Sequence, residues 1–197
     1  MKPMRSLFDD PLPAEGLDLV PNFVQHQTEL LHTIDTQSWI TDLTRRVQHY
    51  GWRYDYRSRA VDQHAYLGPL PEFLQVLAVR LHDEGRMASI PDQAIVNEYL
   101  PGQGIAAHID CEPCFGPQLA TLSLGDDYPM RFTHVASGDA FEIWLPQRSV
   151  CIMSGPARYE WRHEIAKRKS DALSGARKQR KRRVSVTFRT VTRVRGT

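Results

Sequence analysis

Short apolar or alternating runs follow one another through the second half of the chain, separated by Gly, Pro or Asp. Alternation with a period of two places apolar side chains on one face of a strand, and closely spaced runs of this kind are typical of a double-sheet jelly roll or a barrel. The pattern predicts eight strands, which cover residues 93–100, 104–110, 118–125, 129–135, 140–145, 149–155, 157–165 and 182–191.

The first half of the chain has a different pattern. Residues 25–39 carry apolar side chains at helical spacing, and residues 71–85 form the clearest helix, which begins with Pro71 and ends at Gly85. Residues 16–24 predict a short strand and a turn, and residues 51–59 alternate aromatic with charged side chains, as a half-exposed strand does. The predicted fold class is therefore α+β, with helices first and a β-sandwich after them.

Size and composition are those of one globular domain. The chain has 197 residues, of which 41% are hydrophobic and 24% are charged, and this length is too short for two comfortable domains. Three cysteines are too few for a secreted disulfide framework, and no apolar run has the length of a signal-peptide core or a membrane span. We expect a flexible tail at residues 1–15, a single domain at residues 16–197, and a soluble cytoplasmic protein without membrane contact.

A basic segment stands out near the C-terminus. Residues 167–183 contain nine Lys or Arg and one acid, a net charge of +8, so the rest of the chain carries about −6 to give the total of +2. Because like charges repel, residues 167–182 are expected to form a mobile loop rather than a packed element. This loop would contact a polyanion such as nucleic acid, or it is only a solvated part of the surface.

The stretch GIAAHIDCEPCFG, residues 104–116, concentrates side chains that bind metals. On a strand, His108 and Asp110 project to the same side, and His163, on a later predicted strand, is the natural third ligand, with His134 as the other strand histidine. Two histidines and one carboxylate leave three coordination positions open, which suits a non-haem Fe(II) that binds O₂ and a co-substrate together. A zinc site more often has four protein ligands, or three and one water.

The last predicted strand carries two arginines on one face. The period of two places Arg183 and Arg189 on the same side, with apolar side chains on the other. Burial of two arginines is costly unless an anion meets them, and a small carboxylate ligand, which a guanidinium binds in a two-pronged geometry, would be such an anion. Asn97 and Tyr99 likewise share one face of the strand that precedes His108.

In their order along the chain these motifs resemble the AlkB family of Fe(II)/2-oxoglutarate dioxygenases. NEYLPGQGIAAHID (97–110) is similar to the family's Asn-x-Tyr, Pro-Gly and His-x-Asp segment, and SLG (123–125), SGPARYEWRH (154–163) and RRVSVTFR (182–189) follow as in the family. The likeness covers about residues 16–192 and, within the family, looks closest to the AlkB domain of the tRNA-modifying homologue. It implies a double-stranded β-helix, or jelly roll, with N-terminal helices packed against one sheet.

The resemblance also implies roles for site residues and cofactors. Fe(II) would be bound by His108, Asp110 and His163. The co-substrate 2-oxoglutarate, which is consumed with O₂, would be held by Asn97, Tyr99, Arg183 and Arg189. In that scheme Arg189 pairs with the distal carboxylate of 2-oxoglutarate, with Tyr99 as a hydroxyl donor, while Arg183 lies nearer the carboxylate at the metal and orients Asp110.

Two regions are candidates for contact with the substrate. Aromatic and basic side chains interleave in the N-terminal part that forms a substrate lid in relatives, and they are Arg45, Arg46, Trp52, Tyr54 and Tyr56. Such side chains stack on bases and bind phosphates, although a half-buried strand with exposed aromatic edges has the same pattern. Glu112 follows the metal Asp by two residues, where an acidic residue touches the target base in some relatives.

Cys111 and Cys114 form a CxxC motif that has several interpretations. It is typical of a zinc knuckle or of a redox pair. No second CxxC accompanies it, and the deaminase signature lacks its His-x-Glu. The third interpretation is a structural or incidental pair in the loop that leaves the metal strand.

The leading hypothesis is an AlkB-like dioxygenase that acts on nucleic-acid bases, either by oxidative dealkylation or by hydroxylation of a tRNA base. The alternative is a 2-oxoglutarate-dependent hydroxylase of a protein or a small molecule. A non-catalytic binding module is the third possibility, against which the complete set of metal ligands argues. Nothing in the sequence requires a protein partner, and it names neither the base nor DNA or RNA as the substrate.

Overall fold

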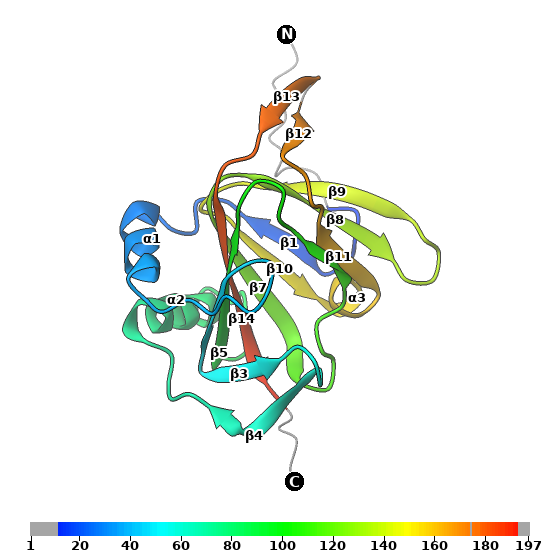
Figure 1. Cartoon of the computed structure of the whole chain (residues 1–197). Helices are drawn as coiled ribbons and strands as arrows, with labels where there is room; N and C mark the ends of the chain where they lie inside the picture. The colour runs from blue at the N-terminus through cyan, green and yellow to red at the C-terminus, as the bar shows by residue number, and fades with distance from the viewer. Residues whose placement is uncertain (1–11, 174, 193–197) are drawn as a thin grey trace.

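Two antiparallel β-sheets form the body of the molecule (Figure 1). The computed structural model describes residues 12–173 and 175–192. The larger sheet has six strands in the order β1 (Leu17–Val20), β10 (Val150–Ser154), β7 (Phe115–Gly125), β14 (Arg183–Val191), β5 (Gln93–Tyr99) and β2 (Val47–Tyr50). The smaller sheet has four, in the order β6 (Ile105–His108), β11 (Trp161–Ile165), β8 (Tyr128–His134) and β9 (Ala140–Leu145).

Two hairpins and three helices are the other regular elements of the described residues. One hairpin pairs β3 (Trp52–Asp55) with β4 (Ala60–Tyr66), and the other pairs β12 (Ser170–Leu173) with β13 (Ala176–Gln179). The helices are α1 (Gln27–Asp35), α2 (Glu72–Asp83) and α3 (Gly155–Tyr159). The β3–β4 hairpin lies at the end of the sheets opposite the β12–β13 hairpin, with β14 running between them (Figure 1).

The strand predictions for the second half of the chain are confirmed except for residues 157–165. There the first residues belong to helix α3, and strand β11 begins only at Trp161. Pro156 stands in the first turn of this helix, where its fixed φ fits and its missing N–H is not needed. The sequence pattern also missed β2 and β4, because neither shows a clear alternation of apolar and polar residues.

The apolar interior divides into two clusters. One joins side chains of α2 with those of β5, β7 and β14, among them Leu74, Leu81, Val96, Leu122 and Val186. The other joins strands of the two sheets, among them Leu119, Tyr128, Phe132, Leu145 and Met153. Successive side chains of a strand point to opposite faces, so the apolar positions of β14 face the first cluster and its arginines face the space between the sheets.

The basic segment is a packed hairpin, and the prediction of a mobile loop is wrong. The side chain of Arg180 is buried and donates hydrogen bonds of 2.5 and 2.8 Å to the buried carboxylate of Asp171. Two further cations pair with acids from distant segments, in the contacts Lys178–Asp126, Arg182–Glu98 and Arg182–Asp35. Part of the positive charge that repels itself along the sequence is therefore compensated by ion pairs in the folded chain.

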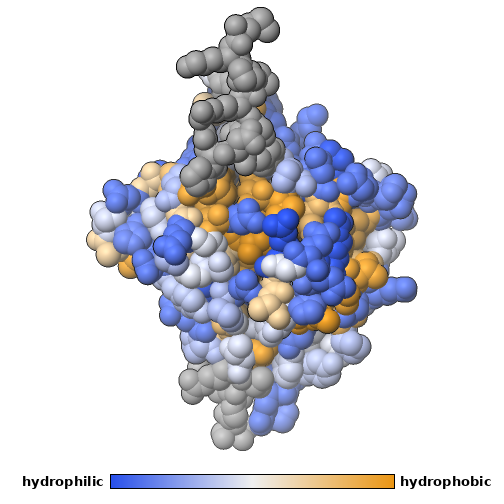
Figure 2. Space-filling model, turned by 180° about the vertical axis from the view of Figure 1, so that it is seen from behind, coloured by the Kyte–Doolittle hydropathy of each residue, from blue (hydrophilic) through white to orange (hydrophobic). Residues whose placement is uncertain are grey.

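The surface seen from behind the view of Figure 1 is mostly hydrophilic, with hydrophobic side chains gathered near its middle (Figure 2). Among the described residues, no helix is long and apolar enough to cross a membrane. The flexible tail expected at residues 1–15 lies mostly outside the residues that the structure describes.

Candidate metal centre and co-substrate pocket

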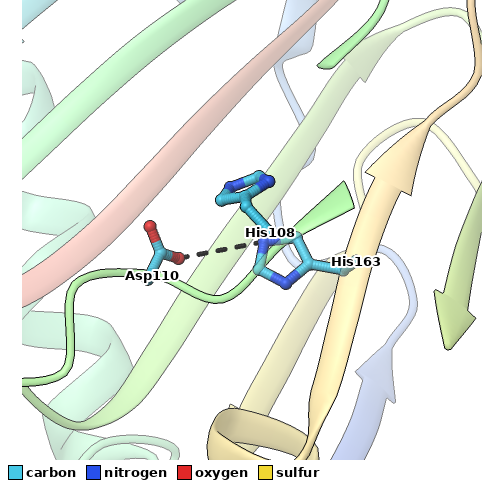
Figure 3. Close-up of side chains that lie close together, drawn as sticks. All are labelled: His108, Asp110 and His163. Atoms are coloured by element: carbon cyan, nitrogen blue, oxygen red, sulfur yellow. Dashed lines mark ion pairs between the residues drawn. The ribbon is translucent and has the colours of Figure 1, made fainter. Parts of the chain in front are cut away.

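Three side chains with metal-binding atoms meet between the two sheets. His108 ends β6, Asp110 follows in the next loop, and His163 lies in the middle of β11. Their ligand atoms all lie within 4.8 Å of one another, and His163 Nε2 is 3.9 Å from Asp110 Oδ2. Figure 3 shows the two imidazoles and the carboxylate pointing toward one another. The grouping predicted from the sequence is therefore present.

The pairing of β6 with β11 brings the two histidines together. His108 stands directly opposite His163 in this antiparallel pair, and their ring centroids are 4.4 Å apart. Gly104 permits the close approach just before β6, because a Cβ atom at this position would collide with the backbone carbonyl of Ile165. A glycine in the sequence thus sets the distance between the strands that carry two of the three candidate ligands.

Asp110 reaches the cluster for a different reason from the predicted one. The strand ends at His108, so the alternation of strand side chains does not place Asp110. Instead, Arg189 Nη2 donates a hydrogen bond of 2.8 Å to Asp110 Oδ1, and the buried guanidinium of Arg158 donates one of 3.0 Å to the Asp110 carbonyl. Side chain and backbone of this residue are therefore each held by an arginine.

The second oxygen of Asp110 fits a metal ligand. Oδ2 is buried and has no hydrogen-bond partner among the residues that the structure describes. Burial alone would raise the pKa of Asp110, but the charge of Arg189 and then the two nearby histidines hold that pKa well below its usual range. A buried anionic oxygen without a donor is costly, and a cation between Oδ2 and the histidines would remove this cost.

A hydrogen bond orients one histidine of the cluster, and burial affects the other. The carbonyl oxygen of Ala106 lies 2.8 Å from His108 Nδ1 and can only accept a hydrogen bond, so Nδ1 carries the proton and Nε2 is left for a metal. Burial and the neighbouring His108 lower the pKa of His163 to about 3, so its ring is uncharged at neutral pH. By contrast, His134 contacts Ser137 and Glu160 and takes no part in the cluster.

A cavity of about 700 Å³ opens beside the cluster. This volume is large enough for a small co-substrate together with part of a larger substrate. The inward face of β14 lines it as the sequence predicted, together with side chains of β5 and β7; the lining includes Asn97, Tyr99, Thr121, Arg183, Thr187 and Arg189. The candidate metal ligands and the candidate co-substrate residues thus share one space.

Arg183 is the strongest sign of an anionic ligand in this cavity. It is 1% exposed, its Nη2 donates a hydrogen bond of 2.9 Å to Ser123 Oγ, and its Nε is buried without a partner among the described residues. No carboxylate of these residues pairs with it, and burial lowers its pKa. The rings of Tyr99 and Tyr128 lie 5.4 and 5.9 Å from the guanidinium carbon. A carboxylate of the co-substrate would supply the missing charge.

The contact expected between Arg183 and Asp110 is wrong, because Arg189 holds this carboxylate. Arg183 lies at the other end of the same strand. The reason is the register of the sheet. β7 begins at Phe115, five residues after Asp110, and Phe115 is paired with Val191 next to the Arg189 end of β14.

The predicted substrate residues divide between two surfaces. Arg45, Tyr54, Tyr56 and Glu112 line the cavity, and Arg45 Nε donates a hydrogen bond of 2.8 Å to Asn97 Oδ1. Arg46 and Trp52 do not line this cavity. Arg46 pairs with Glu98, which points away from the side of β5 that carries Asn97, and Trp52 packs against the ring of Tyr66.

Three residues have a role at this site that the sequence motifs do not indicate. Arg158 holds the loop that carries Asp110, whereas its motif SGPARY indicates only the likeness to the family. Tyr128 and Ser123 surround the guanidinium of Arg183. Ser123 belongs to the SLG motif, but only the pairing of β7 with β14 shows that it stands opposite Ser185, near Arg183. Tyr128 has no sequence signal that distinguishes it from other strand tyrosines.

A jelly-roll pair of sheets, a cluster of two histidines and one carboxylate, and a buried arginine beside it define the class of non-haem iron oxygenases that use a keto-acid co-substrate. The chain belongs to the 2OG-Fe(II) oxygenase superfamily, whose family model matches residues 14–189. Fe(II), 2-oxoglutarate and O₂ are the cofactors of this family, so the chain carries a dioxygenase domain of the oxidoreductase class.

The relatives place the chain among the AlkB homologues. It is 36% identical over 211 residues to the alkylated DNA repair protein ALKBH8 homolog of Arabidopsis thaliana, covering 94% of this chain and 61% of the relative. It is 38% identical over 165 residues to the tRNA (carboxymethyluridine(34)-5-O)-methyltransferase alkbh8 of Xenopus tropicalis, covering 80% of this chain but only 26% of the relative. The chain thus spans less than two thirds of the length of these curated relatives. The solved structure of OsALKBH1 has a TM-score of 0.67 at 20% identity, covering 91% of this chain and 99% of that one, and supports the fold.

Proposed function

We propose that the protein oxidises alkylated or modified bases of nucleic acids, by oxidative dealkylation or by hydroxylation of a tRNA base. The observation that carries the proposal is the lining of the cavity on the side away from Arg183. There Tyr54, Tyr56, Arg45 and Arg59 stand together with Glu112 near the metal cluster. Aromatic rings and arginines suit the stacking of a base and contact with its phosphates. The names of the relatives, which concern DNA repair and tRNA, support the same class of substrate.

The iron would be held by His108, Asp110 and His163, whose ligand atoms lie close together. When bound, Fe(II) with 2-oxoglutarate and O₂ supplies the oxidation of a C–H bond, with release of succinate and CO₂. Arg189 keeps Asp110 ionised and in position. Arg158 fixes the backbone of the same loop, so that the ligand oxygen does not swing away when substrates exchange.

The co-substrate would lie along the inward face of β14. Arg183 would bind its distal carboxylate, with Tyr99 beside the guanidinium and Asn97 nearer the middle of the cavity. Because Asn97 already accepts a hydrogen bond from Arg45, the co-substrate and the wall of the substrate side are linked through one amide. Ser185, the residue opposite Asn97 in the sheet, adds a short hydroxyl to this face. The helices α1 and α2 would support the outer face of this sheet, as the shared apolar cluster indicates.

A base has to leave its stack before it enters a closed cavity, so single strands and loops are the cheaper substrates. Tyr54 and Tyr56 lie edge to face, with ring centroids 5.2 Å apart, and Tyr54 also packs against Phe115. These rings would form the stacking wall. Glu112, an acceptor when ionised, would take a hydrogen bond from an amino or imino group of the base.

The test is turnover on a panel of single-stranded DNA and RNA oligonucleotides with N-methylated bases, and on bulk tRNA. Formaldehyde release indicates dealkylation, and a product heavier by one oxygen indicates hydroxylation. His108→Ala is the control for the iron site and should abolish succinate release. If peptides or small molecules stimulate succinate release and no nucleic acid does, the proposal is wrong and the hydroxylase of a protein or a small molecule takes its place.

A further inference from the structure

The CxxC motif of the sequence is a disulfide at the wall of the cavity. Cys111 and Cys114 are bonded, with Cα atoms 5.3 Å apart. Cys111 directly follows the candidate metal ligand Asp110 and lines the cavity, while both cysteines are almost fully buried. The third cysteine, Cys151, is a free thiol in the interior of β10. The pair therefore stands where a small reagent in the cavity meets the Cys111 sulfur.

Both sulfurs lie against one backbone carbonyl of the turn between β3 and β4. Arg59 O is 3.2 Å from Cys111 Sγ and 3.5 Å from Cys114 Sγ. Arg59 closes the turn between β3 and β4 with a φ of 51°, a conformation that is uncommon for a residue other than glycine. Its side chain lines the same cavity. The sulfur pair thus connects the loop of the metal ligand to the turn that forms part of the substrate side.

The two oxidation states of this pair differ in one physical respect. A thiol donates a weak hydrogen bond, whereas a disulfide sulfur has no hydrogen to donate. In the disulfide form, Arg59 O faces two sulfurs without a donor, and no other described residue donates to it. In the dithiol form, either S–H group can donate to this carbonyl. The strained turn is consequently held more firmly when the pair is reduced.

We propose that Cys111 and Cys114 form a reversible thiol–disulfide site, and that its reduced form fastens the β3–β4 turn over the cavity. The reagent class is a small dithiol. One of its thiolates attacks the Cys111 sulfur, the protein S–S bond breaks, and the reagent then closes to its own cyclic disulfide. Two electrons and two protons pass to the protein, which holds two thiols afterwards. Oxidation by the cyclic disulfide runs the same steps backward.

The metal loop itself is expected to stay in place through this change. The Asp110 side chain is held by Arg189, and the carbonyls of Asp110 and Cys111 accept hydrogen bonds from Arg158. The Arg59 carbonyl, by contrast, has no hydrogen-bond partner among the described residues other than the two sulfurs. The redox state therefore acts on the substrate side and not on the candidate ligands. The consequence for catalysis rests on the proposed function, but the coupling of the sulfurs to the turn does not.

The experiment uses the full chain, without metal, in buffers of reduced and oxidised dithiothreitol. Alkylation under denaturing conditions should count three free thiols in the reduced form and one in the oxidised form. Hydrogen–deuterium exchange of residues 56–61 should be about twofold slower in the reduced form, the factor that a hydrogen bond at the weak end of the usual range gives. Exchange of β6 should not change. A single-stranded oligonucleotide should bind about twofold more tightly to the reduced form, if the proposed function holds.

Two paired variants separate the hydrogen bond from the covalent link. The double variant Cys111→Ser with Cys114→Ser keeps donors and should behave as the reduced form in both buffers. The double variant with Ala at both positions has no donor and should exchange like the disulfide form. Cys151→Ala is the matched control and should keep the redox response. Equal exchange of residues 56–61 in both buffers, or a thiol count that never changes, would overturn the proposal. A redox-dependent exchange without any oligonucleotide binding supports the coupling and contradicts only the nucleic-acid function.

Discussion

Replacement of Arg189 tests most directly which of the two arginines holds Asp110. Arg189→Met removes the guanidinium 2.8 Å from Asp110, in a pair whose side chains are 9% and 8% exposed. Two unit charges about 4 Å apart attract by about 4 kcal/mol at an effective dielectric constant of roughly 20, and loss of one partner of a buried pair costs about 3–5 kcal/mol. We expect the metal-free protein to lose about 3 kcal/mol of its free energy of unfolding.

The same change should weaken metal binding. Outer residues that hold a ligand typically contribute about 10- to 100-fold to metal affinity, so Mn²⁺, used as a redox-stable substitute for Fe(II), should bind to Arg189→Met less tightly by that factor. Calorimetric titration measures the affinity, and urea unfolding in the presence of a chelator measures the stability.

Arg183→Met is the matched control. It removes an arginine from the same strand and from an equally buried position, but one that contacts Ser123 and not Asp110. Its affinity for Mn²⁺ should be nearly that of the natural protein, whereas its KM for 2-oxoglutarate should rise by at least about tenfold, because a charge-assisted hydrogen bond to the carboxylate is lost. If Arg183→Met loses more metal affinity than Arg189→Met, the reasoning from the sheet register is refuted.

Three further predictions concern stability and assembly of the site. Burial and then the neighbouring arginines lower the pKa of His49 from 6.5 to about 4, so the folded state is fully favoured above pH 6.5 and loses stability as the pH falls toward 4; His49→Gln should remove up to about 3 kcal/mol of this pH dependence in urea unfolding. Arg180→Met should cost about 1–3 kcal/mol of stability, since the buried carboxylate of Asp171 loses two hydrogen bonds and keeps only its pair with Arg168. Gly104→Ala should separate β6 from β11 and lower the affinity for Mn²⁺ by at least about tenfold.

Each of these three predictions has its own control variant and a result that would contradict it. For His49 the comparison is His64, an exposed histidine of β4, whose replacement by Gln should leave the pH profile as it is; equal profiles for both variants would contradict the burial argument. For Arg180 the comparison is exposed Lys169→Gln, expected to change stability by less than about 0.5 kcal/mol. Gly138→Ala, at an open surface turn, controls for Gly104, and a normal metal affinity in Gly104→Ala would show that β6 tolerates the added carbon.

The faces of single strands could be predicted from the sequence, whereas the contacts between strands could not. Arg183 and Arg189 were placed on one face because strand side chains alternate, a property of the chain itself. Which of them meets Asp110 depends on the pairing of β14 with β7, and this pairing joins residues that are 58 to 76 positions apart. Arg46 is a similar case. The sequence groups it with Arg45 as a candidate for substrate contact, but in the folded chain it meets the face of β5 that carries Glu98.

The charge of the basic segment is a second case in which the local pattern was insufficient. The acids that compensate Lys178 and Arg182 come from positions 126, 98 and 35. A count of charged residues along the segment includes only the repulsion between neighbouring cations. The hairpin becomes stable because distant carboxylates replace this repulsion with ion pairs, and because Arg180 and Asp171 pair inside it.

By itself, the sequence determined most strands of the two sheets, the residues that share their faces, and the set of candidate ligands, because these follow from spacing and side-chain chemistry. Only the tertiary structure decided that Arg158 and Arg189 hold Asp110 after its strand has ended, and that the two cysteines lie against the turn at Arg59. These contacts join segments whose separation along the chain carries no periodic signal. They arise from the register of antiparallel strands and from burial, which a pattern of neighbouring residues does not contain.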